Sequence, residues 1–312
     1  MSKNMLNQTH IEGVIYEHAL EMKTTGPNSK APGTQFITGT LSVATDNACV
    51  NVVPVHFTYV TATTAKGSAN ATFTLLKSVI DGDVGTYMKD GPDKAGKVRI
   101  DSALGLNEFY TDRNGKTELV STMRNEGGFV HSTAILAEDE NTRNTFTCDM
   151  LITNVIHVDA DEERGTSDKC IVKGAIFDFR KSLLPVEFTA VNPNAMNYFE
   201  GLGATQKEPV FTKLWGRQIS ESIVRTIEEE SAFGEPSVRE VRKTNRAFVI
   251  TGAAKEPYLW DDESTMTAQE LIEAIANRET YLAGVKQRQD EYNASKGKGA
   301  SATAPAQNDF KF

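Results

Sequence analysis

The chain has 312 residues, of which 39% are hydrophobic, and its formal net charge is −9. This length is enough for two ordinary globular domains, and the absence of any run of 18 apolar residues argues against a membrane-spanning helix. The acidic balance argues against a protein that coats nucleic acid by bulk charge alone, so nucleic-acid binding would depend on where the basic residues cluster. The polar residues 1–10 lack the apolar segment of a secretory signal, which predicts a cytoplasmic protein.

Cysteine and histidine residues give no sign of catalysis or of metal binding. Cys49, Cys148 and Cys170 are too scattered for a disulfide framework or a metal motif, as expected in a reducing cytoplasm. The five histidines show no metal-ligand spacing, and neither a Gly-rich phosphate loop nor a Gly-x-Ser-x-Gly elbow occurs. We therefore predict a non-enzymatic protein with no cofactor and no metal.

The first half of the chain predicts three strands, a helix and two more strands. The strands are expected over residues 11–22, 36–43, 52–60, 98–110 and 118–124, with the helix over 70–80. Asn114 and Gly115 join the last two strands and are the strongest short hairpin signal, because both residues tolerate positive φ. This order of elements is that of an OB-fold, a five-stranded Greek-key barrel.

The second half repeats this order, which indicates an internal duplication. Residues 52–60 align with residues 183–191 without a gap, and five of the nine pairs are identical. Each copy has an upstream strand with one glycine, Gly39 or Gly174. In the second copy, strands are expected over residues 147–158, 170–179, 183–191, 209–227 and 246–252, a helix over 194–202, and a charged excursion over 228–244. Pro54 and Pro185 lack an N–H donor, so an edge or a bulge is expected at each.

A helix is expected to begin at Thr267, because Thr267 and Glu270 form a capping box. Its apolar residues recur near helical spacing and predict docking on the second barrel or on a partner subunit; they are Leu271, Ile275, Leu282 and Val285. The fold class we predict is mainly β, with two tandem OB barrels, a C-terminal helix and a disordered tail. The predicted domains are residues 1–145, 146–260, 264–292 and 293–312.

The last residues combine a linker with an aromatic tip. Residues 295–307 consist of Gly, Ala, Ser, Thr, Lys, Pro and Gln, a composition typical of a flexible tether. Phe310 and Phe312 follow Asp309 and have no neighbouring sequence that would bury them. They are either a partner-binding tip or a frayed end.

Basic and aromatic residues alternate over residues 211–217. A positive groove follows phosphates while rings stack on bases, and each stack contributes roughly 1–3 kcal/mol. Phe211, Lys213, Trp215 and Arg217 share one side of a strand because side chains alternate with a period of two. They predict a DNA-binding face, unless Phe211 and Trp215 belong to the core instead.

The predicted hairpin carries a second candidate DNA-binding set, which is Phe109, Tyr110, Arg113, Lys116 and Arg124. Hairpins at this place in OB-folds commonly wrap the bound strand. These aromatics could equally pack against their own hairpin.

Two smaller sets complete the candidates. Phe57 and Phe188 occupy matching positions of the duplicated strands, as either a shared stacking position or a shared core position. Phe177, Phe179, Arg180 and Lys181 form a cluster that is either a DNA contact or core plus a charged turn.

The duplicated strands, the hairpin, the block from Lys213 to Arg217 and the Phe-terminated tail together resemble the tandem OB-fold single-stranded DNA-binding proteins of tailed phages of Gram-positive bacteria. The resemblance implies sequence-nonspecific binding and protection of single-stranded DNA in phage replication, recombination and repair. It also implies that Asp309, Phe310 and Phe312 engage a replication or recombination partner. Oligomerisation stays open.

The alternative from another class is a phage virion protein, a tail or capsid component that uses two β-barrels for protein contacts. Such a protein would also be acidic, β-rich and free of catalytic motifs. The basic-aromatic strand face and the tethered aromatic tip favour DNA binding, because a lattice protein needs neither. An oligosaccharide-binding OB protein is a third possibility.

Overall fold

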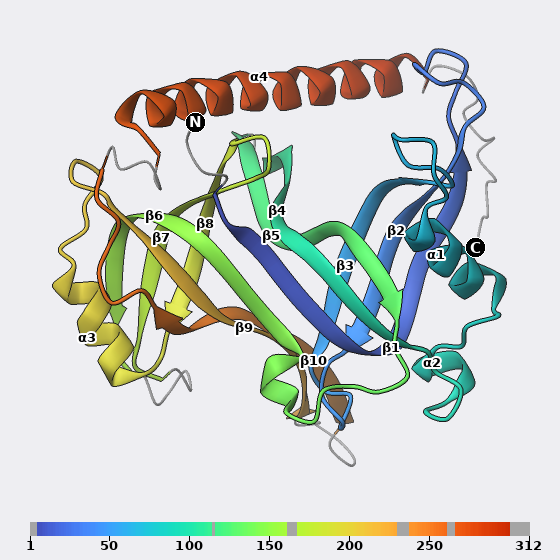
Figure 1. Ribbon diagram of the computed structural model, residues 1–312, viewed down its shortest axis with the longest axis horizontal. Helices are drawn as coiled ribbons and strands as arrows, with labels where there is room; N and C mark the ends of the chain where they lie inside the picture. Colours follow the sequence, from blue (N-terminus) through green and yellow to red (C-terminus); the bar gives the residue numbers. More distant parts are fainter. Residues whose placement is uncertain (1–4, 114–115, 161–166, 230–236, 261–265, 300–312) are drawn as a thin grey trace, which may run out of the picture.

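The computed structural model describes residues 5–113, 116–160, 167–229, 237–260 and 266–299 (Figure 1). Over these ranges the protein is mainly β, and its strands form one ten-stranded sheet that closes on itself twice. The fold predicted from the sequence, two tandem OB barrels and a C-terminal helix, is confirmed. None of the helices in these ranges has the length and apolar character needed to cross a membrane.

Five strands close the first barrel: β1 (Asn7–Thr24), β2 (Gln35–Ala44), β3 (Val52–Thr61), β4 (Lys97–Arg113) and β5 (Lys116–Ser132). Strand β1 pairs with both β2 and β4, and a short parallel pairing of β3 with β5 closes the ring. Helix α1 (Ala71–Asp81) follows β3, and the Asn70 side chain caps its first turn. The short α2 (Tyr87–Asp90) precedes β4.

The second barrel has the same connectivity, which confirms the duplication. Its strands are β6 (Asn144–Val158), β7 (Lys169–Phe177), β8 (Leu183–Ala190), β9 (Val210–Glu229) and β10 (Ser237–Ala253). Strand β6 pairs with β7 and β9, and β8 meets β10 in parallel. Helix α3 (Pro193–Gly201) lies between β8 and β9, as α1 lies between β3 and β4, and the short helix η1 (Glu140–Thr142) leads into β6.

The shared aromatics of the duplicated strands are core residues. Phe57 in β3 and Phe188 in β8 are both 0% exposed, each inside its own barrel. Phe188 stacks on Phe146 with ring centroids 4.9 Å apart. The prediction that Phe57 and Phe188 stack on DNA bases is therefore wrong, because no ligand reaches a ring that is enclosed by its own barrel.

The matching glycines allow strands to cross closely in these tight barrels. A side-chain carbon on Gly39 would lie 2.1 Å from the carbonyl oxygen of Ala19. One on Gly174 would lie 2.0 Å from that of Leu151. Both positions therefore require glycine for the same steric reason.

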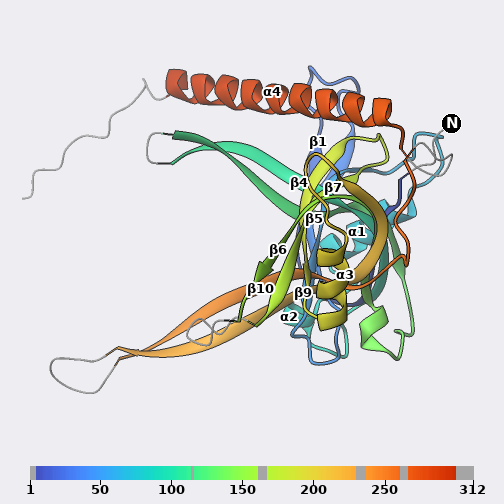
Figure 2. The same cartoon turned by 90° about the vertical axis from the view of Figure 1, so that its left-hand side faces the viewer.

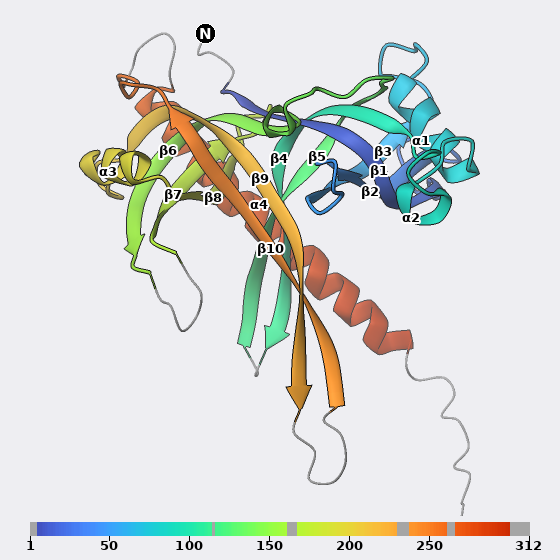
Figure 3. The same cartoon turned by 90° about the horizontal axis from the view of Figure 1, so that it is seen from below.

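Two long hairpins project from the body on the same side (Figures 2 and 3). In the first, β4 and β5 pair as far as Arg113 and Lys116, which confirms the predicted hairpin, while Asn114 and Gly115 lie outside the described residues. In the second, β9 and β10 pair from Leu214 and Ala253 out to Glu229 and Ser237. Strand β10 thus begins nine residues before the predicted strand, so most of the segment expected to be an excursion is paired strand.

The two barrels are joined through backbone and side-chain hydrogen bonds. Strands β1 and β6 pair antiparallel from Asn7 with Cys148 to Ile11 with Asn144. The buried amides of Asn125 in β5 and Gln218 in β9 donate to each other's oxygens, both at 2.9 Å. The Gln218 carbonyl also accepts a hydrogen bond from the Asn51 side chain of the first barrel and, within the second barrel, one from the Asn144 side chain. These contacts fix the position of one barrel against the other.

Helix α4 (Ala268–Gly299) lies across both barrels and contacts β4 and β8 (Figure 1). The predicted capping box is present, with the Glu270 N–H donating to Thr267 Oγ1 at 3.2 Å and the Thr267 N–H donating to Glu270 Oε2 at 3.0 Å. The two terminal guanidinium nitrogens of Arg278 donate hydrogen bonds to the carboxylate of Glu108, whose side chain is 1% exposed. The prediction that this helix docks on the second barrel is therefore incomplete, because α4 also contacts the first barrel through β4.

The helix also ends later than predicted. It continues to Gly299, beyond the expected end at Tyr292, and no proline occurs in residues 293–299 to stop it. The start of the segment assigned to the flexible tail is therefore helical.

Replacing Asn125 tests the amide pair between the barrels. Asn125→Ala leaves the buried Gln218 amide without its partner, so we expect the free energy of unfolding to fall by about 1–3 kcal/mol. Urea unfolding followed by circular dichroism measures the change, with the exposed Asn28→Ala as the control. In a double-mutant cycle with Gln218→Ala, additive losses would show that the two amides do not stabilise each other.

Candidate nucleic-acid interface

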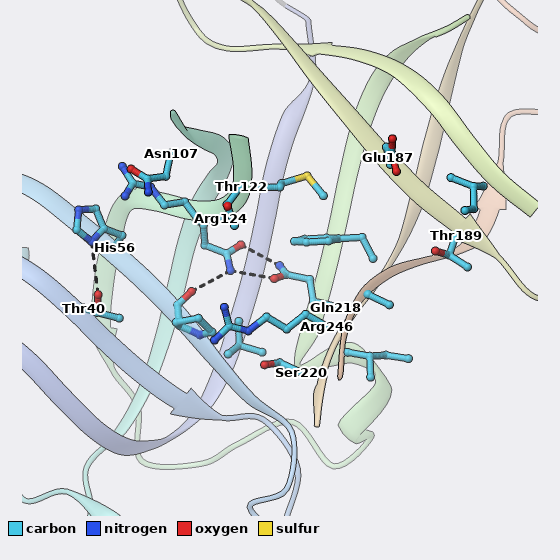
Figure 4. A pocket seen from close by; sticks show the side chains of 18 residues that line it. Thr40, His56, Asn107, Thr122, Arg124, Glu187, Thr189, Gln218, Ser220 and Arg246 are labelled. Carbon is cyan, nitrogen blue, oxygen red and sulfur yellow. Dashed lines mark hydrogen bonds between the residues drawn. The ribbon is translucent and has the colours of Figure 1, made fainter. Parts of the chain in front are cut away.

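A cavity of about 650 Å³ lies between the two barrels and between the bases of the two hairpins (Figure 4). Strands β2 and β3 of the first barrel line one side, and β7 and β8 of the second barrel line another. The hairpins β4–β5 and β9–β10 supply the remaining walls. By the duplication, β2 and β3 are equivalent to β7 and β8, and the hairpin β4–β5 is equivalent to β9–β10, so corresponding faces of both barrels meet in one space.

The strand alternation explains which side chains reach the cavity. His56 precedes the core residue Phe57, and Glu187 precedes the core residue Phe188, so both point to the outer face. Figure 4 shows His56 and Glu187 on opposite sides of the cavity. The sequence alignment shows that His56 and Glu187 are equivalent positions. Because their residue types differ, however, sequence reasoning interprets them as variable surface positions. Both residues directly precede a shared core phenylalanine, and this position in the strand could have predicted that they face the cavity.

Two guanidinium groups reach this space from the hairpins. Arg124 lies on β5 and is 26% exposed, and its Nε donates to Glu126 Oε1 at 2.7 Å, which orients the group. Arg246 lies on β10 and is exposed. On the opposite wall, Lys173 Nζ lies 2.6 Å from Glu187 Oε1 and offsets the charge of that carboxylate.

The rest of the lining mixes hydrogen-bonding and apolar groups. Hydroxyl and amide side chains come from both barrels and both hairpins: Thr40, Asn107, Thr122, Thr189 and Ser220. Half-buried apolar side chains lie among them: Met123, Ile171, Ile219 and Phe248. Such a lining offers donors to phosphate oxygens and apolar surface to sugars and bases.

His56 is electrostatically coupled to this site. Burial, reinforced by the nearby Arg124 charge, lowers the pKa of His56 below its ordinary 6.5, and Glu126 partly opposes this shift. Its Nδ1 lies 3.4 Å from Thr40 Oγ1. Above the lowered pKa, the neutral imidazole can donate one hydrogen bond and accept another, and a bound phosphate would favour its protonated form.

Of the four residues predicted to form a DNA-binding face on β9, Phe211 is buried. Phe211 is 3% exposed and packs against Tyr258, with ring centroids 5.3 Å apart, in a core cluster that includes Ala274 of α4. Phe211 is therefore not a DNA-stacking residue, because the segment after β10 covers it. Lys213, Trp215 and Arg217 continue the face beyond this cover.

Trp215 is 40% exposed and lies against Gly252, where a side-chain carbon would come within 2.4 Å of the indole nitrogen. The structure brings Trp215 close to Lys213 and Arg217 on one face of β9. The described lining of the cavity includes none of these three residues. Their role in DNA binding stays a prediction.

The hairpin candidates divide along the length of β4 and β5. Phe109 is 41% exposed and Tyr110 is half-buried, while Arg113 and Lys116 pair through their backbones at the far end. Of the predicted set, Arg124 reaches the cavity.

The cluster at residues 179–181 lies on other surfaces. Phe179 is 84% exposed, and the Arg180 guanidinium lies 5.0 Å from the centre of its ring. Lys181 Nζ lies 3.0 Å from Glu270 Oε1, so this lysine anchors α4. Asp309, Phe310 and Phe312 lie outside the described residues, and their partner-binding role stays a prediction.

The sequence matches the model of the YorF family over residues 6–288. The chain belongs to the YorF family. No curated protein matches the sequence. Among solved structures, the single-stranded DNA binding protein from Thermus aquaticus is similar to this YorF-family chain at 12% identity and a TM-score of 0.45, covering 81% of this chain and 94% of the other. A deletion mutant of the same Thermus protein is similar at 12% identity and a TM-score of 0.45, covering 83% of this chain and 97% of the other.

The coupling between Arg124 and His56 can be measured directly. We expect Arg124→Gln to raise the pKa of His56, because the substitution removes a repulsive positive charge and leaves the attractive Glu126. A pH titration of the imidazole proton resonances by NMR, assigned with His56→Gln, gives this pKa. Arg99→Gln on the same barrel is the control. A midpoint that is unchanged or lower in Arg124→Gln would contradict the coupling.

Proposed function

We propose that the protein binds single-stranded DNA without sequence preference in the cavity between the barrels, and that it is a binding protein rather than an enzyme. One observation carries the proposal: the matching outer faces of two OB barrels converge on one cavity, where Arg124, Arg246 and His56 come together. An OB barrel binds oligonucleotides on this face and between its loops.

The groups in the cavity suit the two components of a nucleic-acid strand. Arg124 and Arg246 pair with phosphates, and the released counterions make the affinity fall with salt. Phe248 and the neighbouring apolar side chains offer contact to bases, whose faces are free in a single strand and stacked in a duplex. This difference favours single strands over duplex DNA.

The proposed lack of sequence preference follows from the hydrogen bonding of two buried amide side chains. Gln218 and Asn125 lie at the cavity, but each amide is engaged by the other. They therefore do not offer the bidentate contacts that read base edges. Because these amides also hold the barrels together, the two binding faces are already in place before DNA arrives, which lowers the free-energy cost of binding.

Removing each arginine tests the site. We expect Arg124→Ala and Arg246→Ala each to weaken binding, and to reduce the slope of log affinity against log salt by about 1 for each phosphate that is no longer neutralised. Fluorescence anisotropy of a labelled oligo-dT of about 30 nucleotides, a length suited to two OB folds, measures both quantities over a salt series. Duplex DNA is the competitor control, and Arg99→Ala is the matched variant control.

The variant Trp215→Ala distinguishes DNA binding in the cavity from DNA binding on the outer face of β9. If the cavity carries the binding, Trp215→Ala changes the affinity less than Arg246→Ala does. A larger loss in Trp215→Ala, with both arginine variants unchanged, would place the DNA on the face formed by Lys213, Trp215 and Arg217. No binding of any nucleic acid at low salt would favour the virion structural protein instead.

We also propose that the segment from Asn308 to Phe312 recruits replication or recombination proteins in a phage-infected cell. The support is its sequence, an acidic residue and two aromatics on a polar tether, which raises the local concentration of a partner near bound DNA. Deleting residues 308–312 should leave the DNA affinity unchanged or higher and abolish co-purification of such partners with the DNA-bound protein. A loss of DNA binding on deletion would refute this role.

A further inference from the structure

Three metal-ligating side chains from different elements meet where α3 lies against β6 and β7. They are His157 near the end of β6, Cys170 near the start of β7 and Glu200 near the end of α3, and their donor atoms all lie within 4.8 Å of one another. Cys170 Sγ lies 3.2 Å from Glu200 Oε1 and 3.7 Å from His157 Nδ1. His157 Nδ1 lies 2.6 Å from Glu200 Oε1.

The backbone holds these three residues in place. His157 and Cys170 are direct partners in the pairing of β6 with β7. Glu200 follows Phe199, which is 1% exposed and anchors α3 in the core of the second barrel. Cys170 is itself 0% exposed, so its thiol approaches the cluster from the protein interior.

The second nitrogen of the histidine has a carboxylate partner. His157 Nε2 lies 2.9 Å from Asp168 Oδ1. A histidine that binds a metal usually donates its other ring N–H to a carboxylate or a carbonyl, which fixes the ring and its tautomer. Asp168 occupies the place of such an orienting residue.

We propose that His157 Nδ1, Cys170 Sγ and Glu200 bind one zinc ion, with Asp168 orienting the histidine. A thiolate, an imidazole and a carboxylate form a donor set that zinc accepts, and the soft sulfur disfavours magnesium and calcium. On binding, the thiol loses its proton to solvent, so that the sulfur binds as the thiolate.

The observed spacing is close to that of a bound ion. Tetrahedral zinc with ordinary bond lengths places sulfur about 3.5 Å from a nitrogen or oxygen ligand. The two distances from Cys170 Sγ, 3.7 and 3.2 Å, bracket this value. The distance between His157 Nδ1 and Glu200 Oε1 must open from 2.6 Å, and the Glu200 side chain, 40% exposed, has room to move.

The first barrel shows that an OB barrel does not require this cluster. The first and second strands of each barrel pair antiparallel, β1 with β2 and β6 with β7. The last pair of β1 and β2 is Thr24 with Gln35, whereas His157 and Cys170 pair one step before the end of β6 and β7. Near its end, the same strand pair thus carries two neutral side chains in one copy and ligating side chains in the other.

A zinc ion at this place would fasten α3 to the end of the β6–β7 pair. Three protein ligands leave one coordination position for water, but the elements that supply them are structural parts of the barrel. The role assigned is therefore to stabilise the second barrel, independently of DNA binding in the cavity.

Cobalt and zinc titrations of the full-length protein test the site. After treatment with a chelator, the protein should bind one Co²⁺ per chain, with a thiolate-to-cobalt charge-transfer band in the near ultraviolet and visible bands typical of four-coordination. Zinc should displace the cobalt and raise the melting temperature. Cys49→Ser, which removes a thiol remote from the cluster, should retain the band.

Substitutions of the proposed ligands should weaken metal binding, whereas substitution of a residue that does not bind the metal should leave it unchanged. Cys170→Ser should abolish the charge-transfer band, and Asp168→Asn should weaken metal binding about 10- to 100-fold, as removal of an orienting residue does. His157→Gln and Glu200→Gln keep the test open if Cys170→Ser fails to fold, and each should weaken zinc binding in calorimetry. No stoichiometric binding by the natural protein, or an unchanged band in Cys170→Ser, would overturn the proposal.

Discussion

The fixed placement of the two barrels is the constraint on which the rest of this structure depends. It rests on the antiparallel pairing of β1 with β6 and on the mutual hydrogen bonds of Asn125 and Gln218. A buried amide is costly when it lacks a partner, and each of these two amides satisfies the other. The contact is therefore specific, since a shift of either barrel would leave buried polar groups unpaired. Helix α4 reinforces the arrangement by contacting both barrels and binding Glu108 through Arg278.

This placement turns two separate surfaces into one site. A single OB barrel offers an open face, and here the faces of two barrels enclose a common cavity. The hairpins β4–β5 and β9–β10, equivalent by duplication, extend that site with Arg124 and Arg246. Because the faces are already oriented in the free protein, little ordering would be needed when the proposed ligand, single-stranded DNA, binds. The hydrogen bonds between the buried amides of Asn125 and Gln218 hold the two faces in this orientation.

The duplication has kept the interior and changed the exterior. Phe57 and Phe188 are retained because each fills a closed barrel, where a change of volume costs stability. The neighbouring outer positions have diverged to His56 and Glu187, so the two halves of the cavity differ in charge. Near the end of β6 and β7, His157 pairs with Cys170, whereas the equivalent strands β1 and β2 end with the pair of Thr24 and Gln35. The same scaffold thereby supports the proposed DNA-binding face in both copies and the proposed zinc site in one.

The sequence by itself determined the local elements and their order. Period-two alternation, the hairpin signal between β4 and β5, the repeated strand and the Thr267–Glu270 capping box are local signals, and each predicted an element that the structure contains. Tertiary structure alone decided which outer faces meet, because alternation assigns a side chain to a face without saying what covers that face. Phe211 and Trp215 share one face of β9, yet the segment after β10 buries the first and leaves the second exposed. His157, Cys170 and Glu200 show no motif spacing, because strand pairing and helix docking, rather than sequence proximity, bring them together.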